Sequence, residues 1–158
     1  MAIEIERKYT LSNDNWRSQV SHSKTYRQGY MAGSNKSSVR IRTEDDQANI
    51  NIKSATLGIQ RQEYEYSIPL TDAHQMLDQL CEHPLIEKTR HFVIHDGKTW
   101  EIDEFKGDNL GLIVAEIELD SEDEKINLPD WVAEEVSQDV RYYNVSLVKH
   151  PFKDWDKS

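Results

Sequence analysis

The amino-acid sequence predicts an α+β fold that is mainly β: an eight-stranded antiparallel β-barrel with helices packed on its outside. Three observations lead to this expectation. Eight segments have the composition of strands, and eight strands are enough to close a barrel. Most of these segments alternate charged with uncharged residues, which places the charges on one face of each strand. Turn signals between several segments favour antiparallel neighbours.

The expected strands follow one another along most of the chain. They cover residues 2–9, 24–32, 37–44, 47–54, 60–69, 86–95, 98–106 and 112–119. The segment Ala32-Gly33-Ser34-Asn35 separates the second strand from the third, and Asp96-Gly97 is suited to a tight hairpin between the sixth and the seventh.

Three helices and a final helical turn complete the expected elements. The clearest helix has Thr71 as its N-cap and ends before Pro84, and its apolar stripe should cover the barrel exterior. That stripe consists of Ala73, Met76, Leu77, Leu80 and Cys81. A second helix is expected near Asn13, and a third near Pro129, which would carry Trp131, Val132 and Val136. Residues 144–150 should form a short helical turn, and residues 153–158 a loose tail.

Length and composition indicate one domain over residues 1–158. The formal net charge of -10 and the pI of about 5.0 argue against general nucleic-acid coating, although they allow a local basic site. The single cysteine, Cys81, is expected to pack in the core and fits a reducing compartment. No apolar run has membrane-spanning length and no signal-peptide pattern is seen, so we expect a cytoplasmic protein without a membrane partner. A homodimer is compatible with the sequence.

The charged strand faces are expected to converge on the barrel interior. Each pair alone would be read as a solvated strand face, but the recurrence along the chain indicates a charged lumen. The candidate acids are Glu4, Glu6, Glu63, Glu65, Glu101, Asp103, Glu116 and Glu118. The candidate bases are Lys8, Arg40, Arg42, Lys53, Arg61, Lys88 and Arg90. Buried charges must be paired, hydrated or matched to a ligand. Arginine and lysine bind phosphate oxygens, and carboxylates hold hard divalent cations, so the mixture suits a polyphosphate with a metal ion.

The segment Glu4-Ile5-Glu6-Arg7-Lys8 resembles the ExExK signature of the CYTH superfamily, the triphosphate tunnel metalloenzymes. In that family an RxR pair, a lone lysine, an acidic pair, a KxR pair and two further acidic pairs follow in order. This chain matches the order with Arg40 and Arg42, Lys53, Glu63 and Glu65, Lys88 and Arg90, Glu101 and Asp103, and Glu116 and Glu118. The resemblance runs from Ile3 to about Asn144 and includes the segments 26–30 and 139–144. Val140 stands where short members often have proline.

The resemblance implies a role for each charged group. It assigns Glu4, Glu6, Glu116 and Glu118, with Asp103, to a site for Mg²⁺ or Mn²⁺. It assigns Lys8, Arg40, Arg42, Lys53, Lys88 and Arg90 to the phosphates of the substrate. The candidate catalytic residues are Lys8, Glu63, Glu65 and Asp103. In the implied mechanism, a water activated by the metal or oriented by a carboxylate attacks the terminal phosphorus in line.

The expected function is metal-dependent hydrolysis of a triphosphate, with inorganic tripolyphosphate yielding pyrophosphate and phosphate. A class IV adenylyl cyclase, which converts ATP to cyclic AMP and pyrophosphate, is the first alternative, although the compact chain shows no obvious insertion for base recognition. A non-catalytic module that binds polyphosphate or nucleotide is the second, although many carboxylates would repel its ligand. An RNA 5′-triphosphatase fits the acidic net charge less well.

Overall fold

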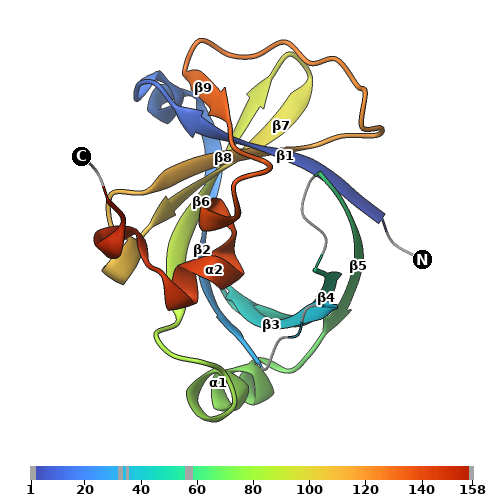
Figure 1. The fold of residues 1–158 in the computed structure, drawn as a ribbon, viewed down its shortest axis with the longest axis vertical. Helices are drawn as coiled ribbons and strands as arrows, with labels where there is room; N and C mark the ends of the chain where they lie inside the picture. The colour runs from blue at the N-terminus through green and yellow to red at the C-terminus, as the bar shows by residue number, and fades with distance from the viewer. Residues whose placement is uncertain (1–2, 32–33, 35, 56–58, 157–158) are drawn as a thin grey trace.

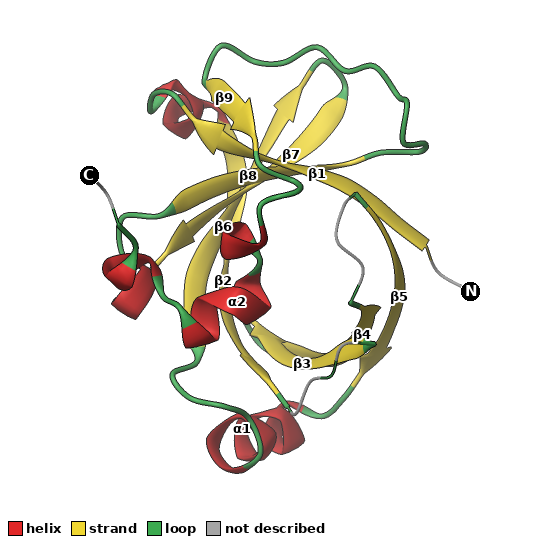
Figure 2. Cartoon of the chain, viewed as in Figure 1, coloured by secondary structure: helices red, strands yellow, loops and turns green. Residues whose placement is uncertain are grey.

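The computed structural model describes residues 3–31, 34, 36–55 and 59–156, and its strands form a closed eight-stranded antiparallel barrel (Figures 1 and 2). Around the barrel the order is β1-β5-β4-β3-β2-β6-β7-β8, and β8 pairs with β1. The barrel strands are β1 (Ile3–Leu11), β2 (Val20–Tyr30), β3 (Ser37–Glu44), β4 (Gln47–Ser54), β5 (Gln60–Ser67), β6 (Ile86–His95), β7 (Lys98–Phe105) and β8 (Ile113–Glu118). The predicted fold class and all eight predicted strands are confirmed.

Strand β1 closes the barrel by pairing along both of its edges. One edge pairs with β8. The other edge pairs with β5 over residues 3–5 and with a ninth strand, β9 (Val132–Glu135), at Tyr9 and Leu11. The third predicted helix, near Pro129, is therefore wrong. Pro129 lies in a turn that leads into β9. Residues 132–135 form a strand because β5 leaves part of one edge of β1 free, and the backbone groups of that edge can pair with a strand but not with a helix.

The remaining helices lie outside the barrel wall or at one end of it. The helix expected near Asn13 is a 3₁₀ segment, η1 (Asn15–Gln19), which buries Trp16. Helix α1 (Leu70–Gln79) has Pro69 as its N-cap, so Thr71 lies in its first turn and does not cap it. The predicted exterior position of α1 is confirmed: Ala73 and Leu77 pack with Ile41 of β3 beneath the barrel (Figure 1).

One of the two turn predictions is confirmed and the other falls outside the described residues. Asp96 and Gly97 have φ values of 52° and 74°, the positive angles that a two-residue hairpin turn between β6 and β7 requires. In the segment 32–35, only Ser34 is described. Within the described residues, no helix is long and apolar enough to cross a membrane.

The C-terminal segment packs against one end of the barrel. It contains η3 (Val140–Tyr142), α2 (Asn144–Lys149) and η4 (Phe152–Asp154), and η2 (Gly107–Asn109) precedes β8. Figure 1 shows α2 lying across the front of the barrel. On the inward faces of β7 and β8, the charged residues give way at one end to the apolar residues Phe105 and Val114. Leu147 and Trp155 pack on these two side chains. The predicted turn at 144–150 is confirmed as α2.

The expected loose tail is wrong for its described part. Trp155 is buried and its ring nitrogen donates to the carbonyl of His150 at 3.1 Å. An indole buries enough apolar surface to hold a short segment in place, and here its polar hydrogen also has a partner. Residues 157 and 158 lie outside the described residues.

Candidate functional site

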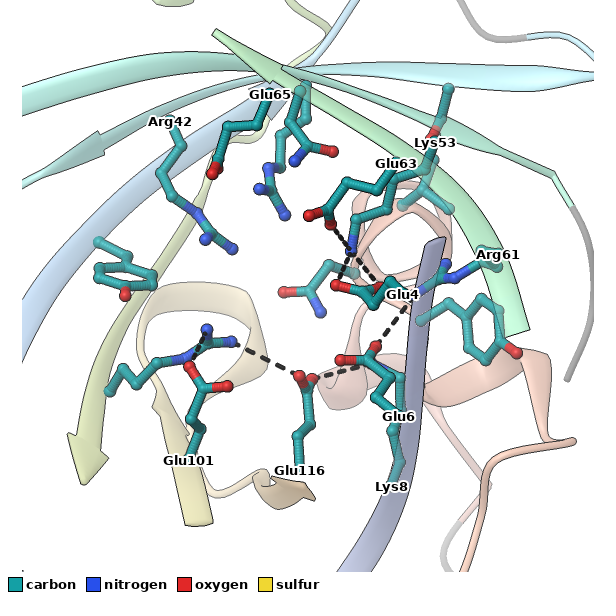
Figure 3. Close-up of a pocket in the computed structure, with 18 of the residues that line it drawn as sticks. Glu4, Glu6, Lys8, Arg42, Lys53, Arg61, Glu63, Glu65, Glu101 and Glu116 are labelled. Carbon is teal, nitrogen blue, oxygen red and sulfur yellow. Dashed lines mark hydrogen bonds and ion pairs between the residues drawn. The ribbon is translucent and has the colours of Figure 1, made fainter. Parts of the chain in front are cut away.

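A cavity of about 230 Å³ lies inside the barrel, and charged side chains from the inward faces of the strands line it (Figure 3). All predicted site residues except Asp103 are among them. From the N-terminus these are Glu4, Glu6, Lys8, Arg40, Arg42, Lys53, Glu63, Glu65, Lys88, Arg90, Glu116 and Glu118. The two-residue period of the strands brings them together, as the alternation of charge predicted.

The register between β1 and β8 aligns two acids and one acid–base pair. Glu6 lies opposite Glu118, and Lys8 lies opposite Glu116. The Lys8 ammonium donates to Glu116 at 2.9 Å and lies 3.9 Å from Glu6. Burial alone would lower the pKa of Lys8, but Glu116 and Glu6 hold it above its usual value. Burial would likewise raise the pKa of Glu116, yet Lys8 and Arg90 hold it well below its usual range. Both side chains are therefore charged at neutral pH.

Two basic residues bridge the acids of β1 to strand β5. Lys53 lies 3.0 Å from Glu4 and 3.3 Å from Glu63. Arg61 lies 3.0 Å from Glu6 and 3.5 Å from Glu4, because Arg61 is the register partner of Glu4 where β5 closes the barrel. Glu65 is exposed and has no ion pair among the described residues. Arg61 belongs to the site although the family pattern assigned it no role.

Several carboxylates remain mutually repulsive despite these pairs. Burial and the charge of Glu116 raise the pKa of Glu6. Burial raises the pKa of Glu101, where the repulsion of Glu116 offsets part of the attraction of Arg90. Burial and the charges of Glu101, Glu4 and Glu6 raise the pKa of Glu118, and within the described residues Glu118 has no basic partner. This part of the cavity carries more negative charge than its own bases compensate.

The donor chemistry of this acidic part fits a divalent cation. Carboxylate oxygens are the ligands that Mg²⁺ and Mn²⁺ prefer, and a cation here would relieve the repulsion among Glu6, Glu101 and Glu118. Over the described residues, no three His, Cys, Asp or Glu side chains form a ready-made metal site. The fit therefore rests on the type of donor and on the uncompensated charge.

The opposite wall of the cavity carries two arginines that have no carboxylate partner among the described residues. Among the described residues, no hydrogen bond or ion pair holds Arg40, and its Nε is buried without a partner. Arg42 donates its Nε to Gln28 at 3.0 Å and has no carboxylate partner. Burial, with Arg40 and Arg90 adding repulsion, lowers the pKa of Arg42 to about 10. Unsatisfied buried guanidinium groups are costly, so this wall is built to receive an anion.

Asp103 lies behind the cavity wall. It is fully buried and accepts from Lys88 at 2.6 Å and from Arg90 at 2.7 and 2.9 Å. Burial would raise the pKa of Asp103, but Arg90 and Lys88 lower it to about 2. For Lys88 burial dominates, and the pKa falls to about 7. These contacts are those of a positioning residue, and the metal-binding and catalytic roles expected for Asp103 stay predictions.

Neutral polar residues complete the site, and charge alternation did not identify them. Gln28, fully buried, donates to the Tyr30 hydroxyl at 3.2 Å and to Asn144 at 3.4 Å. Asn144, the first residue of α2, also accepts from Lys88 at 3.0 Å. Both residues fall in the segments 26–30 and 139–144 that carried the family resemblance, which was the available signal. The C-terminal segment is thus bonded directly to a lumen lysine.

Fold and site together define a class of protein: a closed antiparallel barrel whose lumen sets an unpaired arginine wall against a cluster of carboxylates. The family model that describes the CYTH domain matches residues 2–152, and the chain belongs to this family. The chain is 44% identical over 155 residues to a protein named inorganic triphosphatase from Acetivibrio thermocellus, covering 98% of this chain and 99% of that one.

A second relative and a solved structure agree with this assignment. A protein from Nitrosomonas europaea, also named inorganic triphosphatase, is 35% identical over 148 residues, which cover 91% of this chain and 95% of that one. The crystal structure of an inorganic triphosphatase matches with a TM-score of 0.66 and 32% identity, over 94% of this chain and 95% of the other.

Proposed function

We propose that this chain is an inorganic triphosphatase that hydrolyses tripolyphosphate to pyrophosphate and phosphate with the help of Mg²⁺ or Mn²⁺. The observation that carries the proposal is the unpaired Arg40–Arg42 wall, which faces a carboxylate cluster across one cavity. A linear polyanion with a bridging cation complements both walls. The two relatives named inorganic triphosphatase support the same conclusion. The single cysteine, Cys81, is free and buried, which leads us to propose a reducing, cytoplasmic location.

The basic residues bind and orient the substrate. Arg40 and Arg42 receive phosphate oxygens, which satisfies the buried Nε of Arg40. Lys53 and Lys8 contact further oxygens from the carboxylate side of the cavity. Lys88 and Arg90, held by Asp103, stabilise the negative charge that develops on the leaving oxygen. Because Asp103 already fixes the Lys88 and Arg90 side chains in place, these two groups need little reorganisation during the reaction.

The carboxylates would hold the metal ion and accept the proton of the attacking water. Glu4, Glu6, Glu116 and Glu118 would hold the ion, which supplies Lewis-acid polarisation of phosphate oxygens and lowers the pKa of water. Glu63 and Glu65 orient the attacking water. The water oxygen forms a bond to the terminal phosphorus, the phosphoric anhydride bond breaks, and its electron pair leaves on pyrophosphate. The proton of the water passes to a carboxylate oxygen and then to solvent.

The test is phosphate release from tripolyphosphate with Mg²⁺, with Mn²⁺ and with chelator, alongside ATP. Metal-dependent release of phosphate and pyrophosphate is expected. At low tripolyphosphate concentration Arg40→Ala should slow this release because it binds the substrate more weakly, whereas Tyr66→Ala, on the outer barrel face, should not. Cyclic AMP and pyrophosphate formed from ATP would identify a cyclase instead. Tight binding of tripolyphosphate without any product would leave a non-catalytic tunnel.

A further inference from the structure

Unsatisfied polar atoms gather at one place in the lumen wall. Among the described residues, six buried side-chain nitrogen or oxygen atoms have no hydrogen-bond partner, and four of these lie on β3 and β4. They are Arg40 Nε, Asn49 Oδ1 and both polar atoms of the Asn51 carboxamide. Asn51 is the register partner of Arg40, and it lines the cavity although it is only 1% exposed. Native folds rarely leave buried polar atoms unpaired, so this part of the wall has the character of a binding site.

The Asn51 carboxamide offers an acceptor that the basic residues beside it lack. Phosphate oxygens mainly accept hydrogen bonds at neutral pH, so Arg40 Nε and the Asn51 NH₂ group can bind them, but the Asn51 carboxamide oxygen cannot. That oxygen needs a donor, and water is the donor that a hydrolytic reaction supplies. Because neither carboxamide atom has a partner, both orientations of the group leave one free donor and one free acceptor.

A carboxylate on the next strand can accept the proton of this water. Glu65 on β5 is the register partner of Asn51, and its side chain also lines the cavity (Figure 3). Glu65 has no ion pair among the described residues, whereas Glu63 lies 3.3 Å from Lys53. Burial would raise the pKa of Glu63, but contacts that include Lys53 and Asn51 lower it. A carboxylate with a lowered pKa is the weaker proton acceptor, which favours Glu65 for this step.

We propose that Asn51 is a further catalytic residue, which holds the attacking water together with Glu65. The inference rests on the proposed function. The carboxamide oxygen accepts one hydrogen of the water and Glu65 accepts the other, so that a lone pair of the water faces the terminal phosphorus, whose oxygens Arg40 binds. The water oxygen bonds to phosphorus, the anhydride bond breaks, its electron pair leaves on pyrophosphate, and the proton passes to Glu65.

The first test separates kcat from KM for tripolyphosphate. Asn51→Leu removes both polar atoms at similar side-chain volume. We expect kcat to fall about 10- to 100-fold while KM changes by less than about threefold, because the lost contact is with the reacting water. Urea unfolding should show no loss of stability, since the removed atoms have no partner. Asn49→Leu is the matched control: Asn49 lies on the same face of β4 but does not line the cavity, so kcat should stay at the wild-type value.

The second test uses methanol as a competing nucleophile. Methanol has one hydroxyl hydrogen, so it cannot donate to Asn51 and Glu65 at once, and the wild-type protein should form little methyl phosphate. In Asn51→Ala only Glu65 accepts a hydrogen. The ratio of methyl phosphate to phosphate, measured by phosphorus NMR, should therefore rise about fivefold, the factor expected for one neutral hydrogen bond. A side chain that only supports the sheet would change the rate without changing this ratio.

Three outcomes would overturn the role of Asn51. An unchanged kcat in Asn51→Leu, with or without a higher KM, would mean that the side chain does not hold the water. An unchanged product ratio in Asn51→Ala would make Asn51 a structural residue. Both results leave the proposed function intact. The third outcome, a wild-type protein that does not cleave tripolyphosphate, would remove the proposed function and this role together. If Asn51→Leu does not fold, Asn51→Ala serves for both tests.

Discussion

Replacing Asp103 by asparagine removes the one buried carboxylate that both Lys88 and Arg90 contact. The pKa of Asp103 lies at about 2 in the folded protein against an ordinary 3.8, a difference of about 1.8 units. At about 1.4 kcal/mol per unit, this corresponds to a stabilisation on the order of 2–3 kcal/mol at neutral pH. Breaking a buried ion pair by removing one partner costs about 3–5 kcal/mol. We expect Asp103→Asn to destabilise the protein by about 3 kcal/mol.

Urea unfolding and thermal melts without added metal measure this loss. For a domain of this size, about 3 kcal/mol corresponds to a fall in Tm of about 6–12 °C. Asp139→Asn is the matched control, because Asp139 also binds an arginine, at 2.7 Å, but near the surface. Its cost should stay below about 1 kcal/mol. A loss below 1 kcal/mol in Asp103→Asn would refute the positioning role, and a selective loss of metal affinity would make Asp103 a metal ligand.

The same variant has a defined pH dependence. Because folding lowers the pKa of Asp103, the stabilisation is complete above the unfolded value of 3.8 and is lost as the pH falls toward about 2. The difference in unfolding free energy between wild type and Asp103→Asn should therefore be largest near neutral pH and should narrow below about pH 4. A constant difference from pH 7 to pH 2.5 would contradict the assigned pKa.

Three further changes follow from the same site. Arg40→Ala should raise KM for tripolyphosphate by about 10- to 100-fold, as expected for a lost charge-assisted contact, with unfolding by urea unchanged because Arg40 has no partner among the described residues. Glu118→Gln should weaken Mg²⁺ activation in a metal titration. It should raise stability without metal by no more than about 1 kcal/mol, since burial and the repulsion of neighbouring carboxylates raise the pKa of Glu118, and a lower Tm would contradict this. Leu147 is fully buried where α2 packs against the barrel, so Leu147→Ala should cost about 2–5 kcal/mol in urea unfolding, and a smaller loss would mean that α2 packs only loosely.

Alternation of charge made the barrel strands and the lumen predictable. A period of two decides which face a residue occupies, and the charges of Glu4, Glu6 and Lys8 recur at that period, alternating with isoleucines and an arginine. The position of α1 was predictable for a similar reason, since its apolar stripe needs a sheet face to cover. The strands, the lumen and the position of α1 depend only on the local sequence pattern and on the rule that apolar faces are buried.

The features that escaped prediction depend on contacts between distant parts of the chain. Strand β9 forms because β1 has a free edge beyond β5, which no pattern within residues 129–136 reveals. Asp103 has the same spacing as the lining acids, and only the packing of Lys88 and Arg90 places it behind the wall. Asn144 is uncharged, so nothing in its neighbourhood indicated a contact with Lys88.

The pairing of β1 with three different strands has a consequence for how the protein folds. Its site residues contact partners 57, 108 and 129 positions away: Glu4 with Arg61, Lys8 with Glu116, and the Lys8 amide with Ser137. Such non-local pairing favours slow folding, on the scale of milliseconds to seconds. During synthesis β1 must wait for β8 and β9, so the acidic side of the lumen assembles only after the chain as far as Glu135 has left the ribosome.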